Sequence, residues 1–128
     1  MKRYLVLWIL VAILAGLIYP GYAKSMEKEF GITAGSENDQ SAGIQKYLNK
    51  ISADGGGIAY LPAGQYTLKG SITVPTGVTL TGSWTIPHHG IMSRGTVFLA
   101  SANRGTEDAP ALINLEQSSG IRGLTVEG

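Results

Sequence analysis

The chain has 128 residues, of which 44% are hydrophobic and 15% are charged, and its formal net charge is +1. The apolar content is high enough for a folded core and excludes a disordered, highly charged chain. There is no cysteine, which excludes disulfides, thiolate metal ligands and lipid attachment through cysteine. No basic patch with interleaved aromatic residues is present, so nucleic acid is not an expected partner.

The first 23 residues have the pattern of a secretory signal peptide. Lys2 and Arg3 precede an apolar run over residues 4–18, and Gly21 and Ala23 fit a small-x-small cleavage site. The run is shorter than the roughly 20 residues that span a bilayer, although an uncleaved anchor remains the alternative. We predict cleavage after Ala23, which places residues 24–128 outside the cell, in a periplasm or at the cell surface. The membrane is then a partner only through the signal peptide.

Charge changes sign when the predicted signal is removed. The whole chain has 10 basic and 9 acidic residues, and two of the basic ones lie in residues 1–23. Residues 24–128 therefore carry 8 − 9 = −1. We expect them to form one small domain, since a chain of this length can bury a single core.

A helix is predicted from about Ser41 to Ser52. Its apolar residues recur at helical spacing and form one face, at Ile44, Tyr47, Leu48 and Ile51. Asp39 or Ser41 can serve as the N-cap, because a short side-chain oxygen accepts from the first free N–H groups. Gly55 ends the helix, since glycine adopts positive φ without a steric penalty.

Short strands are predicted after the helix. They cover residues 58–61, 66–68, 72–74, 78–80, 97–99, 112–115 and 121–126. Pro62 ends the first strand because it cannot donate a ladder hydrogen bond. The step from Tyr60 to Tyr66, Ile72 and Val78 is six residues, which is tighter than the ~8–12 residues of a sandwich and typical of a solenoid.

Several segments together resemble one known family. They are EFG at 29–31, NDQS at 38–41, AGIQK at 42–46, GGG at 55–57 and YLPAGQY at 60–66, followed by GVTLTG at 77–82 and GIRGLTV at 120–126. This pattern is similar to the N-terminal part of the pectate-lyase superfamily, and especially to its rhamnogalacturonase/epimerase-like, polygalacturonase-related domain. Glu29 and Gln40 depart from the aspartates usual at those positions. The likeness extends over nearly all of the chain after residue 28.

The resemblance implies a fold and a general activity. The implied fold is all-β, a right-handed parallel β-helix whose N-terminal coils are capped by the helix at 41–52. The chain reads as the first coils of a longer, truncated protein. That parent is expected to be an exported lyase or glycoside hydrolase acting on pectin-like or other uronate-containing polysaccharides, with its catalytic residues beyond Gly128. A non-catalytic carbohydrate-binding or surface-attachment module is the alternative. No cofactor is expected in this chain, although Ca²⁺ would suit the parent.

The loop between Gly82 and Gly95 holds the candidate substrate-binding residues. Trp84 offers an indole face for a sugar ring, and Arg94 offers a guanidinium for a uronate carboxylate. His88 and His89 match a Gly-His-Gly motif of polygalacturonase-type relatives only in part. Because the accompanying aspartates are absent, a structural or sugar-contacting loop is favoured over a catalytic one. For Trp84 the favoured interpretation is packing against the first coils, with sugar stacking as the alternative.

Carboxylates are scattered along the chain. Glu107 and Asp108 lie in a predicted loop, and Glu116 and Glu127 end predicted strands. Glycosidases need two carboxyl groups facing one bond, and calcium sites need clustered oxygen ligands. Neither arrangement can be built from this spacing, so no metal site is predicted and the segment by itself is expected to be inactive.

Overall fold

The computed structural model describes residues 21–84, 94–102 and 105–128. It contains helix α2 (Ser41–Ala53) and the strands β1 (Gly57–Leu61), β2 (Gly64–Leu68), β3 (Ile72–Val74), β4 (Val78–Gly82), β5 (Thr96–Ala100), β6 (Ile113–Leu115), β7 (Gly120–Arg122) and β8 (Leu124–Glu127). All of these strands have three to five residues, as the short apolar segments predicted.

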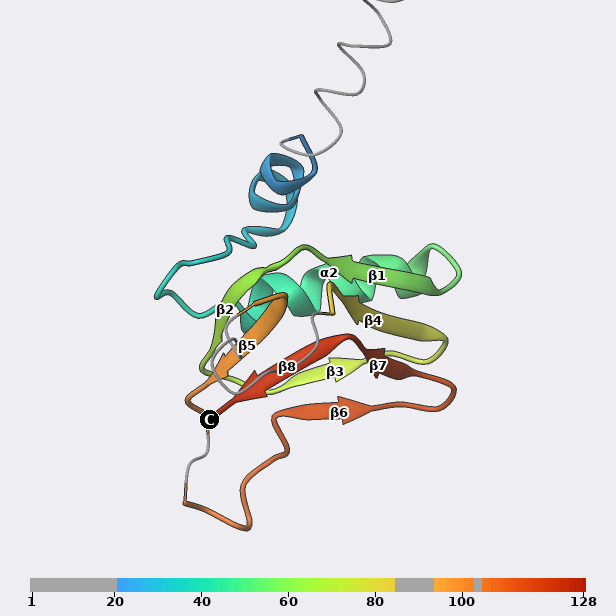
Figure 1. Cartoon of the computed structure of the whole chain (residues 1–128). Helices are drawn as coiled ribbons and strands as arrows, with labels where there is room; N and C mark the ends of the chain where they lie inside the picture. Colours follow the sequence, from blue (N-terminus) through green and yellow to red (C-terminus); the bar gives the residue numbers. More distant parts are fainter. Residues whose placement is uncertain (1–20, 85–93, 103–104) are drawn as a thin grey trace, which may run out of the picture.

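The strands form three parallel sheets in a regular order. Each strand pairs with the strand three places later, which gives the sheets β1-β4-β7, β2-β5-β8 and β3-β6 (Figure 1). Successive sets of strands are therefore stacked, and we call them rungs: β1–β3 is the first, β4–β6 the second, and β7 and β8 form the third. The six-residue step predicted stacking of this kind, and the structure confirms it for β1 to β4.

The register aligns inward side chains into columns. Ala59 pairs with Leu80 and Leu80 with Ile121, while Tyr66 pairs with Phe98 and Phe98 with Val126. In the first two rungs these inward residues are almost completely buried. Along β4 the buried positions alternate with partly exposed threonines, which confirms the predicted alternation of Val78 and Leu80 with Thr79 and Thr81. The core is therefore a set of apolar columns running through the stack.

The segment predicted as one strand over residues 121–126 is in fact two strands in different sheets. Gly123 separates β7 from β8 and has φ +68°, a left-handed conformation that favours glycine. A Cβ at Gly123 would lie 2.6 Å from the carbonyl oxygen of Gly82 in the rung beneath. The prediction was wrong because the apolar alternation continues through the corner, while the chain changes direction.

Helix α2 lies over the first rung, as predicted. Ile44, Tyr47 and Leu48 are buried, and Ile51 is partly buried against the same core. The prediction of the N-cap was wrong, because Gln40 occupies that position and its side chain makes no capping hydrogen bond. Asp39 instead accepts hydrogen bonds from the Ser41 amide and hydroxyl and from the Lys69 amide. Gly55 ends the helix with φ +107°, as expected.

Polar groups next to α2 satisfy the free edge of the first rung. The Gln45 amide donates to the Thr73 carbonyl at 2.9 Å and accepts from the Thr73 N–H at 2.7 Å, so it pairs with β3 as a strand would. The Tyr47 hydroxyl contacts both the N–H and the carbonyl of Tyr60 on β1. Backbone bonds from Gly35 and Gln40 cover β2. Each strand of the first rung thus has partners on its outer edge.

A short helical segment at residues 21–30 extends this cover. Met26 and Phe30 are buried, and the Phe30 ring lies 5.0 Å from that of Tyr47. The Tyr22 hydroxyl donates to the Tyr60 carbonyl and lies 3.0 Å from the Tyr47 hydroxyl. Within the described residues, no helix is both long and apolar enough to cross a membrane.

Candidate functional site

The loop that was predicted to contact substrate has its two ends joined by hydrogen bonds, and we call this pair of ends its base. The Ser83 amide donates to the Thr96 hydroxyl at 2.8 Å, and the Thr96 amide donates to the Ser83 carbonyl at 3.0 Å. The Thr96 hydroxyl also lies within hydrogen-bond distance of the Leu61 carbonyl, which ties the base to the first rung. Trp84 follows directly on this base and is therefore anchored at its backbone.

Trp84 forms one wall of a surface hollow at the corner between two sheets. The hollow has a volume of about 370 Å³ and is lined by Thr81, Gly82, Trp84, Arg122 and Gly123. We call it the corner hollow. The two stacked glycines form its base, and the Trp84 side chain is 63% exposed. The indole therefore remains available at the surface, whereas packing against the first rungs was the favoured expectation.

Thr81 and Arg122 reach the hollow through the register of the sheet. Tyr60, Thr81 and Arg122 are paired in successive strands β1, β4 and β7, and this row faces outward. Neighbouring strands are ~4.8 Å apart, so the row brings an aromatic ring, a hydroxyl and a guanidinium together. Thr81 and Arg122 are not among the binding residues predicted from the sequence, because only the pairing of strands places residue 122 beside residue 81.

The other predicted binding residues are not gathered at this hollow. Arg94 is exposed, two residues before Thr96, and is not among the residues that line the corner hollow. His88 and His89 lie outside the described residues. Of the four predicted residues, Trp84 is therefore the one that the described structure places at a hollow.

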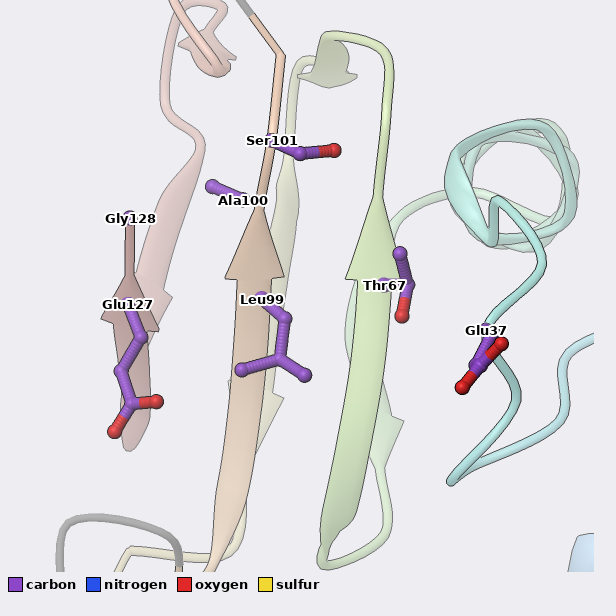
Figure 2. Close-up of a pocket in the computed structure, with 7 residues that line it drawn as sticks. All are labelled: Glu37, Thr67, Leu99, Ala100, Ser101, Glu127 and Gly128. Atoms are coloured by element: carbon purple, nitrogen blue, oxygen red, sulfur yellow. The ribbon is translucent and has the colours of Figure 1, made fainter. Parts of the chain in front are cut away.

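A second hollow lies on the outer face of the β2-β5-β8 sheet. Its volume is about 390 Å³, and Figure 2 shows its lining residues Glu37, Thr67, Leu99, Ala100, Ser101, Glu127 and Gly128. Thr67, Leu99 and Glu127 are paired across the three strands. Glu37 and Glu127 stand at opposite sides, with β2 and β5 between them. We call this the acidic hollow.

The two carboxylates of the acidic hollow are too far apart to act as a pair. β2 and β8 are separated by two strand spacings, or ~10 Å, and Glu37 lies beyond β2. Paired glycosidase carboxyls are at most ~9.5 Å apart. Among the described residues, no three His, Asp or Glu side chains lie close enough to hold a metal ion. Glu116 accepts from the amide and hydroxyl of Thr76, so it braces a turn.

Two tyrosines have raised pKa values. Burial raises the pKa of Tyr66 to about 12, and the hydroxyl donates to the Pro62 carbonyl at 2.8 Å. Burial also raises the pKa of Tyr22 well above its ordinary value, with a further contribution from the hydrogen bond to Tyr47. Both phenols stay protonated at neutral pH. They therefore act as structural hydrogen-bond donors rather than as bases.

Residues 26–120 match the family model described as rhamnogalacturonase A/epimerase, pectate lyase-like. This match covers well over half of the chain. The chain belongs to this family. The match agrees with the resemblance seen in the sequence, and it includes the strands β1 to β6 and the Thr81, Gly82 and Trp84 side of the corner hollow.

Two solved structures are similar to this pectate lyase-like chain. The A-module of the mannuronan C-5 epimerase AlgE4 of Azotobacter vinelandii is 26% identical, with a TM-score of 0.57 over 79% of this chain and 28% of that one. The ORF18 protein of Geobacillus virus E2 is 24% identical, with a TM-score of 0.59 over 92% of this chain and 24% of that one, and it supports the fold alone. The chain thus spans about a quarter of the length of these structures. No curated protein matches the chain.

Proposed function

We propose that this chain is the N-terminal part of an exported right-handed parallel β-helix protein that acts on an acidic, uronate-containing polysaccharide. The observation that carries the proposal is membership of the rhamnogalacturonase A/epimerase family over residues 26–120. The similarity to a mannuronan epimerase module supports it, because mannuronan is a chain of uronic acid residues. The three parallel sheets support the β-helix, since each strand stacks on the strand three places earlier.

The described residues favour binding over catalysis as the contribution of this segment. Glu37 and Glu127 are too widely separated to attack or protonate one glycosidic bond. The corner hollow instead offers an exposed indole beside a guanidinium. The catalytic groups of the parent, whether it is a lyase, a hydrolase or an epimerase, belong in this proposal to coils beyond Gly128. A non-catalytic binding module is the second candidate, and the corner hollow is the observation that favours it.

The test is a binding and turnover assay on the purified, processed chain. Retention on immobilised polygalacturonate or mannuronan, but not on a neutral glucan, is expected. Neither unsaturated uronate, followed by absorbance, nor new reducing ends should appear, with or without Ca²⁺. Absence of binding to every acidic polysaccharide would refute the proposal. Turnover that disappears in a His88→Ala/His89→Ala double variant would instead make the loop after Trp84 an active site.

Export is part of the proposal and has its own test. The basic residues 2–3, the apolar run 4–18 and the small residues at 21 and 23 support cleavage after Ala23. Cleavage there removes Tyr22, while Tyr47 keeps its contacts with Tyr60. Mass spectrometry of exported protein should find an N-terminus within a residue or two of Lys24. Intact Met1 in the membrane fraction would show an uncleaved anchor instead.

A further inference from the structure

The corner hollow brings together three groups of different chemistry on one outer surface. We propose that it binds a single uronate residue of the polysaccharide, with the sugar ring against Trp84, the carboxylate on Arg122 and a sugar hydroxyl on Thr81. This inference rests on the proposed function and specifies the substrate contact. It differs from the sequence-based expectation, in which Arg94 was the carboxylate partner.

The surroundings of Trp84 suit a flat ring. Trp84 is 63% exposed, and the adjoining corner is lined by Gly82 and Gly123. Gly123 is confined to glycine by φ +68° and by the Gly82 carbonyl beneath it. Covering the indole with the apolar face of a sugar removes apolar surface from water. The close contact of Gly82 and Gly123 thus holds the two strands together at the corner beside the exposed indole.

Arg122 supplies a charge that no described acid neutralises. Within the described residues, the single ion pair joins Lys50 to Asp54, on helix α2 and at its end, and does not involve Arg122. The acidic residues Glu37 and Glu127 belong to the acidic hollow, on a different sheet. A planar guanidinium binds a carboxylate through two parallel hydrogen bonds. Its place beside an indole suits a ligand that carries an apolar face and one carboxylate.

Thr81 supplies a hydroxyl that lacks a partner. Its Oγ1 is shielded from solvent and has no hydrogen-bond partner among the described residues. The neighbours of Thr81 in the row are Tyr60 and Arg122, and Arg122 is exposed. In this proposal the exposed Arg122 side chain turns toward the ligand carboxylate, and the bound sugar reaches the Thr81 hydroxyl, since exposed side chains change rotamer within nanoseconds. A ligand hydroxyl would then satisfy a group that the protein itself leaves unpaired.

These three groups together distinguish a uronate from other ligands. A neutral sugar would use the indole but leave the guanidinium without a counter-charge. A nucleic acid would need a basic surface along its backbone, whereas this hollow offers one guanidinium. A uronate residue is the ligand that uses the ring, the charge and the hydroxyl at once.

The experiment measures the affinity of the processed chain for polygalacturonate oligomers of defined length and for their methyl-esterified forms. Esterification removes the negative charge and keeps the sugar ring. For the unmodified chain, esterification and Arg122→Gln should each weaken binding about tenfold, as expected for a hydrogen-bonded charge pair. In the Arg122→Gln variant, esterification should have no further effect, because the two changes remove the same interaction.

Matched variants separate the hollow from general charge and stability. Arg94→Gln removes an equal charge outside the hollow and should leave affinity unchanged. Trp84→Ala should weaken binding of both oligomer forms at least tenfold. Thr81→Val should weaken binding about threefold without lowering the melting temperature, since its hydroxyl has no partner to lose. Thr79→Val, two residues earlier on β4, should change neither quantity.

The outcomes distinguish this inference from the function on which it rests. If the unmodified chain binds no acidic oligomer, the proposed function fails and the inference fails with it. If it binds acidic oligomers but Trp84→Ala and Arg122→Gln leave the affinity unchanged, only the inference is overturned. Equal losses in Arg94→Gln and Arg122→Gln would overturn it too, because they would show a diffuse charge effect.

Discussion

The first and third rungs both have strands at the end of a sheet, but they differ in what covers the outer edges of those strands. On the outer edge of the first rung, Gln45 pairs with Thr73, Tyr47 meets Tyr60, and the backbone near Gln40 covers β2. On the third rung, β7 and β8 have partners on one side only within the described chain. Their inward residues Ile121 and Val126 are 42% and 48% exposed. A covered edge thus needs both an apolar lid and side chains that replace a missing strand.

The largest expected effect is the removal of the apolar lid. Leu48 is fully buried between α2 and the first rung, and Leu48→Asp would place a carboxylate there without a partner. We expect a loss of more than about 4 kcal/mol in the free energy of unfolding, measured by urea denaturation. Ile58→Asp is the matched control, because Ile58 is 67% exposed on β1 and should change little. Equal losses would mean that α2 does not close the first rung.

A second change compares the rungs within one column. Leu80 is fully buried, whereas Ile121, its partner on β7, is 42% exposed. Leu80→Ala should cost about 3 kcal/mol, because it leaves a cavity, while Ile121→Ala should cost less than about 1 kcal/mol. Thermal or urea unfolding of the two variants measures the difference. A similar cost for both would show that Ile121 is covered in solution.

The third change tests the side chain that replaces a strand. Gln45→Met keeps the length of the side chain but leaves the N–H and carbonyl of Thr73 without their partner. A loss of about 1–3 kcal/mol is expected, and hydrogen exchange at the Thr73 amide should speed up. Asn49→Met serves as the control, because among the described residues the Asn49 side chain is hydrogen-bonded to Gln45 and not to β3. An unchanged hydrogen-exchange rate at the Thr73 amide would show that Gln45 does not take the place of a strand beside β3.

The smallest expected effect is the pH dependence contributed by Asp39. Burial raises its pKa, but hydrogen bonds from the Ser41 hydroxyl and from the Lys69 and Ser41 amides outweigh that effect and hold it below the ordinary value of 3.8. A carboxyl with a lowered folded-state pKa adds stability above the unfolded-state pKa and loses it as the pH falls through the folded value. The chain should therefore lose part of its stability as the pH falls below about 4.

Asp39→Asn provides the comparison for this pH effect. The asparagine cannot ionise, so the variant should be slightly less stable at pH 7 and should lose less stability on acidification. Melting temperatures from pH 7 to pH 2 measure both curves. Parallel curves for the two proteins would show that Asp39 contributes nothing to the acid sensitivity of the first rung.

The sequence by itself determined the local elements of this protein. The helical spacing of Ile44, Tyr47 and Leu48 predicted α2, and Gly55 and Pro62 predicted where α2 and β1 end. Apolar periodicity and the backbone preferences of glycine and proline act within a few residues, so the sequence alone reveals them. The motifs of residues 29–66 also indicated the family that the comparisons then established. Trp84 was recognised as a candidate because a large aromatic residue in a predicted loop is conspicuous.

Only the tertiary structure decided which distant residues meet. Pairing of β4 with β7 places Arg122 beside Thr81, and no periodic pattern in one strand contains the register of another. The turn at Gly123 could not be predicted from the sequence for a related reason. Its positive φ accompanies close contact with Gly82 in the neighbouring rung, whereas the apolar alternation continues through it without a break. Long-range contact between strands assembles the corner hollow, whereas local propensity assembles only the strands that meet there.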